Sequence, residues 1–109
     1  MNFDFDELLT QMTNAATATL GPDLTALSGF SQRQLYAMAT QAKLLSEAHA
    51  SGQLSSDAYE FLLNGLHEMG QNFEATLDGL SAIMAARVRA AVEAVLWRAV
   101  AGLTGLPLH

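Results

Sequence analysis

Apolar residues recur along this chain every three or four positions, which is the spacing of one face of an α-helix. The first such series covers residues 4–20 and consists of Phe5, Leu8, Leu9, Met12, Ala15, Ala16 and Leu20. Asp4 and Glu7 have the form of a capping box at its start, and Gly21 followed by Pro22 marks its end. We therefore predict a helix over residues 4–20.

A second helix is predicted over residues 32–50. Its apolar positions are Leu35, Met38, Ala42 and Leu45. Ser31 and Gln34 form a second capping box before it, and Lys43 and Glu47 are placed to pair four residues apart on its outer side. The tetrapeptide SGQL that follows is a suitable length for the turn of an antiparallel helical hairpin.

The third series of apolar residues is the longest and covers about residues 55–104. Its members are Leu62, Leu66, Met69, Phe73, Leu77, Leu80, Met84, Val88, Ala91, Val95, Ala99 and Gly102, which follow an eleven-residue repeat. Such a repeat corresponds to about 3.67 residues per turn and keeps the stripe nearly straight. One continuous helix, roughly 70 Å long, is the simplest interpretation. Gly65, Gly70 and Gly79 weaken it, so a kink or break at residues 77–81, near Gly79, is the main alternative.

These series together predict an all-α protein. We expect an antiparallel helical hairpin or small bundle, built on the long C-terminal helix and the two shorter ones, as a single domain over residues 1–109. The chain is half apolar, only 15% charged and contains two prolines, a composition typical of a folded domain and not of a disordered one.

The charge distribution disfavours binding to nucleic acid. The net charge is −6, and the five cationic residues, Arg33, Lys43, Arg87, Arg89 and Arg98, form no dense basic patch, so we expect no nucleic-acid binding. The chain has no cysteine and hence neither disulfides nor a thiolate metal site.

Neither a membrane span nor a cleaved signal is expected. The C-terminal segment is interrupted by charges, and its longest uncharged run, residues 99–108, is about half of the roughly 20 residues that a spanning helix needs. The opening MNFDFDELL carries three carboxylates where a signal peptide would be basic, which favours a cytoplasmic protein.

Residues 87–103 divide into two apolar faces when they are placed on a helical wheel. The wide face is aliphatic and is expected to pack inside the subunit. The narrow face consists of Ala86, Ala90, Ala94, Trp97 and Ala101. Alanines at four-residue spacing allow close helix approach, and tryptophan is a frequent interface anchor, so we predict that this face packs against a helix of another copy. The alternative is that Trp97 covers the protein's own core through the first helix.

Catalytic and cofactor signatures are missing from the sequence. HEMGQ begins like the zinc motif HExxH but has Gln71 in place of the second histidine. Polar residues do recur on one side of the third predicted helix, namely Glu60, Asn64, His67, Gln71, Glu74 and Asp78. Of these, Glu60, His67 and Glu74 are weak candidates for a metal site, although a solvated polar face is the favoured interpretation. We expect no catalytic residue and no cofactor.

Two functional hypotheses follow. The first is a small, non-enzymatic structural or adaptor protein of bacterial type, a homo-oligomer that acts through helix-mediated self-association or through binding of a helical protein partner. The second is a helical bundle that binds a metal or a small apolar ligand between helices or between subunits.

Overall fold

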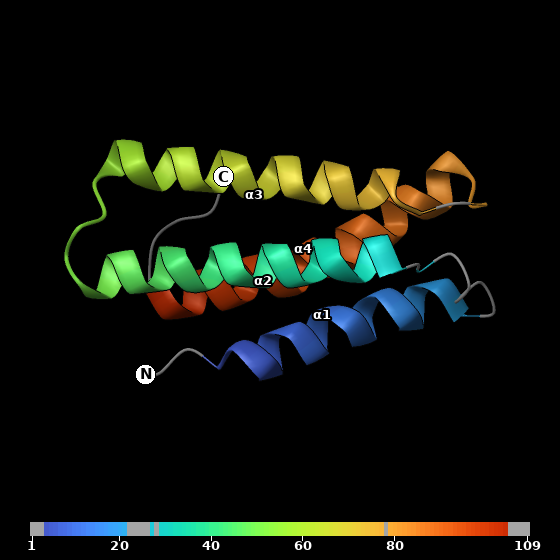
Figure 1. Ribbon diagram of the computed structural model, residues 1–109, viewed down its shortest axis with the longest axis horizontal. Helices are drawn as coiled ribbons and strands as arrows, with labels where there is room; N and C mark the ends of the chain where they lie inside the picture. The colour runs from blue at the N-terminus through green and yellow to red at the C-terminus, as the bar shows by residue number, and fades with distance from the viewer. Residues whose placement is uncertain (1–3, 22–26, 28, 78, 105–109) are drawn as a thin grey trace.

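Four helices and no strand make up the part of the chain that the computed structural model describes, which is residues 4–21, 27, 29–77 and 79–104. The helices are α1 (Phe5–Leu20), α2 (Gly29–Ala50), α3 (Ser56–Ala75) and α4 (Ala82–Thr104) (Figure 1). The prediction of an all-α protein forming a small bundle is confirmed.

The helices run roughly side by side in a bundle that measures 43 × 24 × 20 Å. Helices α1 and α3 lie on opposite sides of α2 in Figure 1, and α4 lies behind α2. Helix α4 contacts all three of the others, most extensively α1. Helix α2 also contacts all three, most extensively α3. These two helices therefore provide the center of the bundle.

The apolar stripes of α1 and α2 form much of the core, as predicted. Leu8, Met12, Ala16 and Leu20 of α1 and Leu35, Met38, Ala42 and Leu45 of α2 are all buried. At the start of α1 the backbone N–H of Glu7 donates to Asp4 Oδ1 at 2.9 Å, so Asp4 caps this helix. On the outer side of α2, Lys43 Nζ lies 3.9 Å from Glu47 Oε1.

The interpretation of residues 55–104 as one continuous helix is wrong, and the alternative break near Gly79 is confirmed. Helix α3 ends at Ala75, Gly79 has a φ of +78°, and α4 begins after Ser81, whose Oγ accepts from the N–H of Met84 at 3.1 Å. Leu77 is buried within the turn. The apolar repeat runs through the turn because the turn itself packs on the core, so periodicity alone does not reveal the break.

The start of α2 also differs from the prediction. The helix begins at Gly29, and Ser31 lies inside its first turn, fully buried, instead of capping it. Ser31 Oγ is 2.8 Å from Thr76 Oγ1 and 3.3 Å from the carbonyl oxygen of Thr76. The hydroxyl therefore joins α2 to the end of α3. This hydrogen bonding offsets the cost of burying a hydroxyl group. Phe30, 64% exposed, lies under the Arg33 guanidinium at 4.8 Å.

Candidate functional site

Helix α4 presents three different surfaces to its surroundings. Its core face is aliphatic and buried, and consists of Ala85, Val88, Val92, Leu96 and Val100. A second surface, here called the α3–α4 seam, comprises His67, Gly70 and Glu74 of α3 with Arg89, Glu93 and Trp97 of α4. The third, the α4 outer face, comprises Ile83, Ala86, Arg87, Ala90, Ala94 and Arg98.

An arginine connects two carboxylates in the α3–α4 seam. Arg89 Nε lies 3.5 Å from Glu74 Oε1 across the seam and 3.9 Å from Glu93 Oε2 one turn further along α4. The Arg89 and Glu74 side chains are 33% and 32% exposed, whereas Glu93 is only 13% exposed. Arg89 and Glu93 pair four residues apart along α4, and the pair with Glu74 adds a link between two helices.

The carboxylate of Glu93 lies directly over Gly70. A Cβ added to Gly70 would stand 3.1 Å from Glu93 Cδ and closer still to one carboxylate oxygen. Gly70 is buried inside α3, where glycine costs about 1 kcal/mol relative to alanine. Glycine thus provides the space that lets the Glu93 carboxylate approach the α3 backbone.

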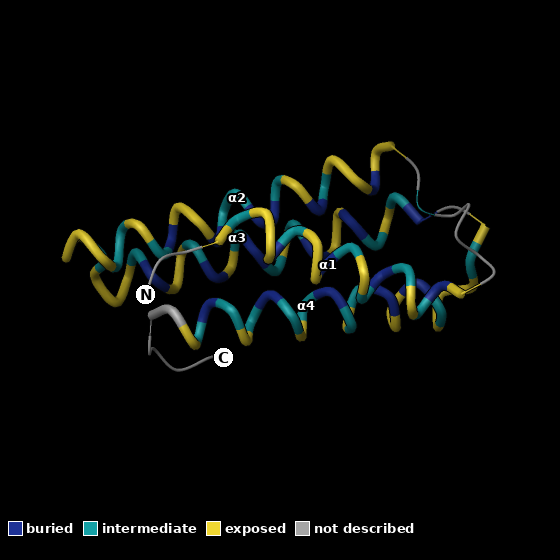
Figure 2. Tube along the Cα trace, turned by 90° about the horizontal axis from the view of Figure 1, so that it is seen from below, coloured by how far each residue is buried: buried dark blue, intermediate teal, exposed yellow. Residues whose placement is uncertain are grey.

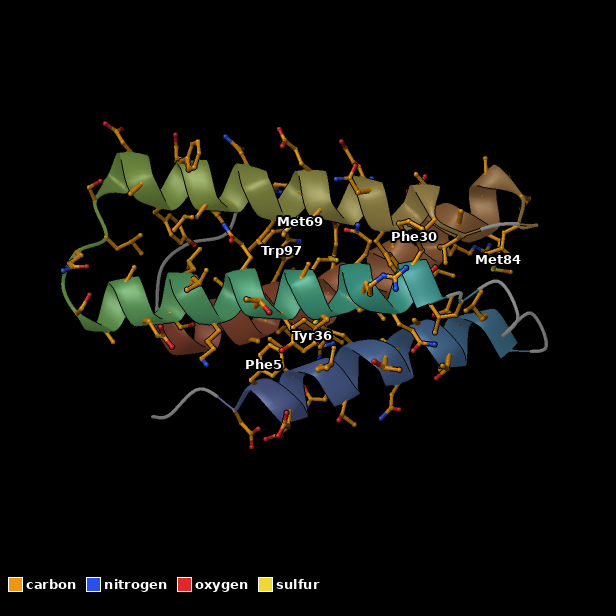
Figure 3. The ribbon with its side chains drawn as sticks, in the orientation of Figure 1. Phe5, Phe30, Tyr36, Met69, Met84 and Trp97 are labelled. Atoms are coloured by element: carbon orange, nitrogen blue, oxygen red, sulfur yellow. The ribbon has the colours of Figure 1, made fainter. Side chains whose placement is uncertain are left out.

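Trp97 packs inside the subunit at the far end of the seam. Its ring centroid lies 4.8 Å from that of His67 with the planes inclined by 49°, and the side chain is half-buried against the core (Figure 3). Trp97 therefore packs against the protein's own core and contacts His67 of α3. It borders the α4 outer face instead of projecting from it.

The three metal-ligand candidates do not come together. Glu60, His67 and Glu74 are seven residues apart along α3, which separates neighbors by about 10 Å of helix rise. His67 packs on Trp97, and Glu74 pairs with Arg89. Within the described residues no group of three or more His, Asp or Glu side chains could hold a metal ion.

The expected solvated polar face is divided in the structure. Asn64 and Gln71 are exposed, whereas His67 and Glu74 lie in the seam, and Asp78 is outside the described residues. Sequence reasoning missed the cross-helix pairs because they depend on the turn. Once α3 and α4 form an antiparallel hairpin, residues whose numbers sum to about 163, such as Glu74 and Arg89, face each other.

The α4 outer face is apolar, small and exposed. Ile83 is 72% exposed, and Ala86, Ala90 and Ala94 are exposed as well, along the side of α4 that points away from the other helices (Figure 2). The exposed side chains of Arg87 and Arg98 flank this row. The one acidic residue of α4, Glu93, is turned into the seam, so the outer face carries only positive charge.

The Arg98 guanidinium and a neighboring groove bear on what the α4 outer face can bind. Arg98 Nε donates to the carbonyl oxygen of its own helix at Ala94, at 3.2 Å, which leaves the terminal nitrogens of its guanidinium for a partner. Ala101, predicted to continue the row, is half-buried. Beside the face, an open groove of about 430 Å³ is lined by Gln11, Val95, Arg98 and Ala99, between α1 and α4.

Comparisons with protein-family models, curated proteins and solved structures find no match to this chain. Across the described residues, none of the helices combines the length and apolarity needed to cross a membrane. Functional inference therefore starts from the surfaces described above.

Proposed function

We propose that this chain is a non-enzymatic structural or adaptor protein that acts through helix-mediated self-association, with the α4 outer face as its contact surface. The observation that carries the proposal is the exposed row of Ala86, Ala90 and Ala94 together with Ile83. Small side chains at four-residue spacing permit two helix backbones to approach closely. An exposed apolar row of this kind gains free energy when a second helix covers it.

The border of the row supports the same assignment. Trp97 is held at the edge of the face by its contact with His67, so a large, partly buried ring already stands beside the alanines. A partner helix on the row would bury more of this indole without reordering it. Preorganized aromatic side chains contribute to association at low entropic cost.

The proposal is tested by sedimentation velocity and light scattering over a range of protein concentrations. Wild type is expected to form a dimer or larger species, and the double variant A90Q/A94Q is expected to be monomeric, because two longer polar side chains prevent close helix approach. The matched control T10Q/N14Q places the same side chains on exposed positions of α1 and should associate like wild type. Circular dichroism checks that all three proteins fold. A wild type that stays monomeric throughout would overturn the proposal.

A further inference from the structure

Helix α3 carries an exposed face whose charge is opposite to that of the α4 outer face. Asp57, Phe61, Asn64 and Glu68 are all exposed, and their spacing of four, three and four residues places them on one side of the helix. We call these four residues the α3 outer face. Phe61 is 76% exposed, the largest value among the exposed large apolar side chains of the described residues. This face therefore offers two carboxylates and one aromatic ring.

The charges on the two outer faces have the same spacing. Asp57 and Glu68 are eleven residues apart on α3, and Arg87 and Arg98 are eleven residues apart on α4. Eleven residues correspond to about three helical turns and about 16.5 Å of rise, so each pair lies in line on its helix. Two helices side by side can consequently satisfy both ion pairs at once.

The apolar residues favor the antiparallel arrangement. With Glu68 opposite Arg87 and Asp57 opposite Arg98, Phe61 stands opposite Ala94, where a small residue makes room for the ring. Ile83 is then covered by α3 near Asn72. A parallel arrangement would also align the charges, but it would set Ile83 opposite residue 53, which precedes the start of α3 at Ser56. Antiparallel packing also aligns the helix dipoles favorably.

We propose that the α4 outer face binds the α3 outer face of a second copy of this chain, antiparallel and in the register just described. This inference rests on the proposed function and specifies the surface that the α4 outer face contacts in the second copy. Packing of α4 on a second α4 would bring four arginines together with no exposed carboxylate, whereas the α3 outer face supplies two. Because the contact joins two different surfaces, a pair of molecules still has one α3 outer face and one α4 outer face free, and the assembly is head-to-tail.

The proposed contact between the two helices is small, so its association must be measured at high protein concentration. Residues 83–98 span about 24 Å of helix, and a helix with its side chains is about 10 Å wide, so the contact is smaller than the ~1,600 Å² of a standard interface. Association is expected to be weak and reversible. It should also weaken as salt rises, because exposed ion pairs are screened. Measurements therefore cover high protein concentration and low salt.

A charge-swap experiment tests both the partner and the register. Sedimentation velocity is expected to show that E68R and R87E each weaken association roughly tenfold, since like charges then face each other. The double variant E68R/R87E should regain most of the wild-type affinity. The control E47R makes the same charge change on α2, outside both faces, and should behave like wild type. Recovery by E68R/R98E in place of E68R/R87E would refute the antiparallel register.

Head-to-tail assembly is tested by mixing two blocked variants. D57R/E68R blocks the α3 outer face, and A90Q/A94Q blocks the α4 outer face. Each alone should be monomeric, and an equimolar mixture should form a 1:1 dimer and nothing larger. Two monomers that do not combine would overturn the pairing. If wild type associates while D57R/E68R associates equally well, this inference fails and the proposed function stands; a monomeric wild type overturns both.

Discussion

Two glycines of α3, Gly65 and Gly70, should respond in opposite directions to substitution by alanine. Alanine is favored over glycine inside a helix by about 1 kcal/mol. At Gly65 an added Cβ would meet Gln41 Nε2 at 3.7 Å, an ordinary contact. Gly65→Ala should therefore raise the free energy of unfolding by about 0.5–1 kcal/mol.

At Gly70 the new methyl group would overlap one oxygen of the Glu93 carboxylate. That carboxylate is held by Arg89 at 3.9 Å and is mostly buried, so moving it costs packing as well as the ion pair. Overpacking typically costs about 1–3 kcal/mol and a partly exposed ion pair up to about 1 kcal/mol. After the gain in helix propensity, Gly70→Ala should lower the free energy of unfolding by about 1–2 kcal/mol.

Urea unfolding, followed by circular dichroism and by the fluorescence of the single tryptophan, measures both effects at a concentration where the chain is monomeric. A double-mutant cycle with Glu93→Ala isolates the contact. In the Glu93→Ala background, Gly70→Ala should become stabilizing, like Gly65→Ala. If Gly70→Ala stabilizes the otherwise wild-type chain as much as Gly65→Ala does, the carboxylate is not held over the glycine and the account of the seam is wrong.

Two further predictions concern contacts between elements. Ser31→Ala and Thr76→Val should each lower the free energy of unfolding in urea by about 1–2 kcal/mol. The double variant should lose clearly less than the sum, because the two hydroxyls share one partly buried hydrogen bond. Additive effects would contradict this shared hydrogen bond. His67→Ala should shift the emission of Trp97 to longer wavelength, because the imidazole covers the indole, whereas the control Asn64→Ala on the exposed side of α3 should leave it unchanged.

Local signals predicted most of the fold correctly. The apolar stripes of α1 and α2 are buried as expected, because three- and four-residue spacing is a direct consequence of helix geometry. The capping box predicted at Ser31 and Gln34 was wrong because a long-range contact, and not local geometry, determines the position of Ser31. Its residues satisfy the local pattern, but α2 begins two residues before Ser31, at Gly29. The Ser31 hydroxyl lies inside the first turn and hydrogen-bonds to Thr76, which is 45 residues away. Such a partner has no local signature.

The surfaces of α4 could be predicted only in part. The wheel separated the alanine row from the aliphatic face, and Ala86, Ala90 and Ala94 are indeed exposed. It placed Trp97 on that row because a wheel treats the helix in isolation. The folded hairpin brings His67 alongside, and the indole packs on this neighbor. The edge of α4 that α3 covers depends on the turn between the two helices. The apolar repeat continues through that turn, so the sequence pattern does not reveal it.

The eleven-residue repeat has a different meaning in the folded hairpin than in a single long helix. A repeat of about 3.67 residues per turn keeps every surface of a helix straight, the outer one as well as the core. On α3 and α4 it sets Asp57 in line with Glu68 and Arg87 in line with Arg98. The spacing that suggested one 70 Å helix is therefore also the spacing on which the proposed pairing of α3 and α4 between copies depends, and the charge-swap variants test that pairing directly.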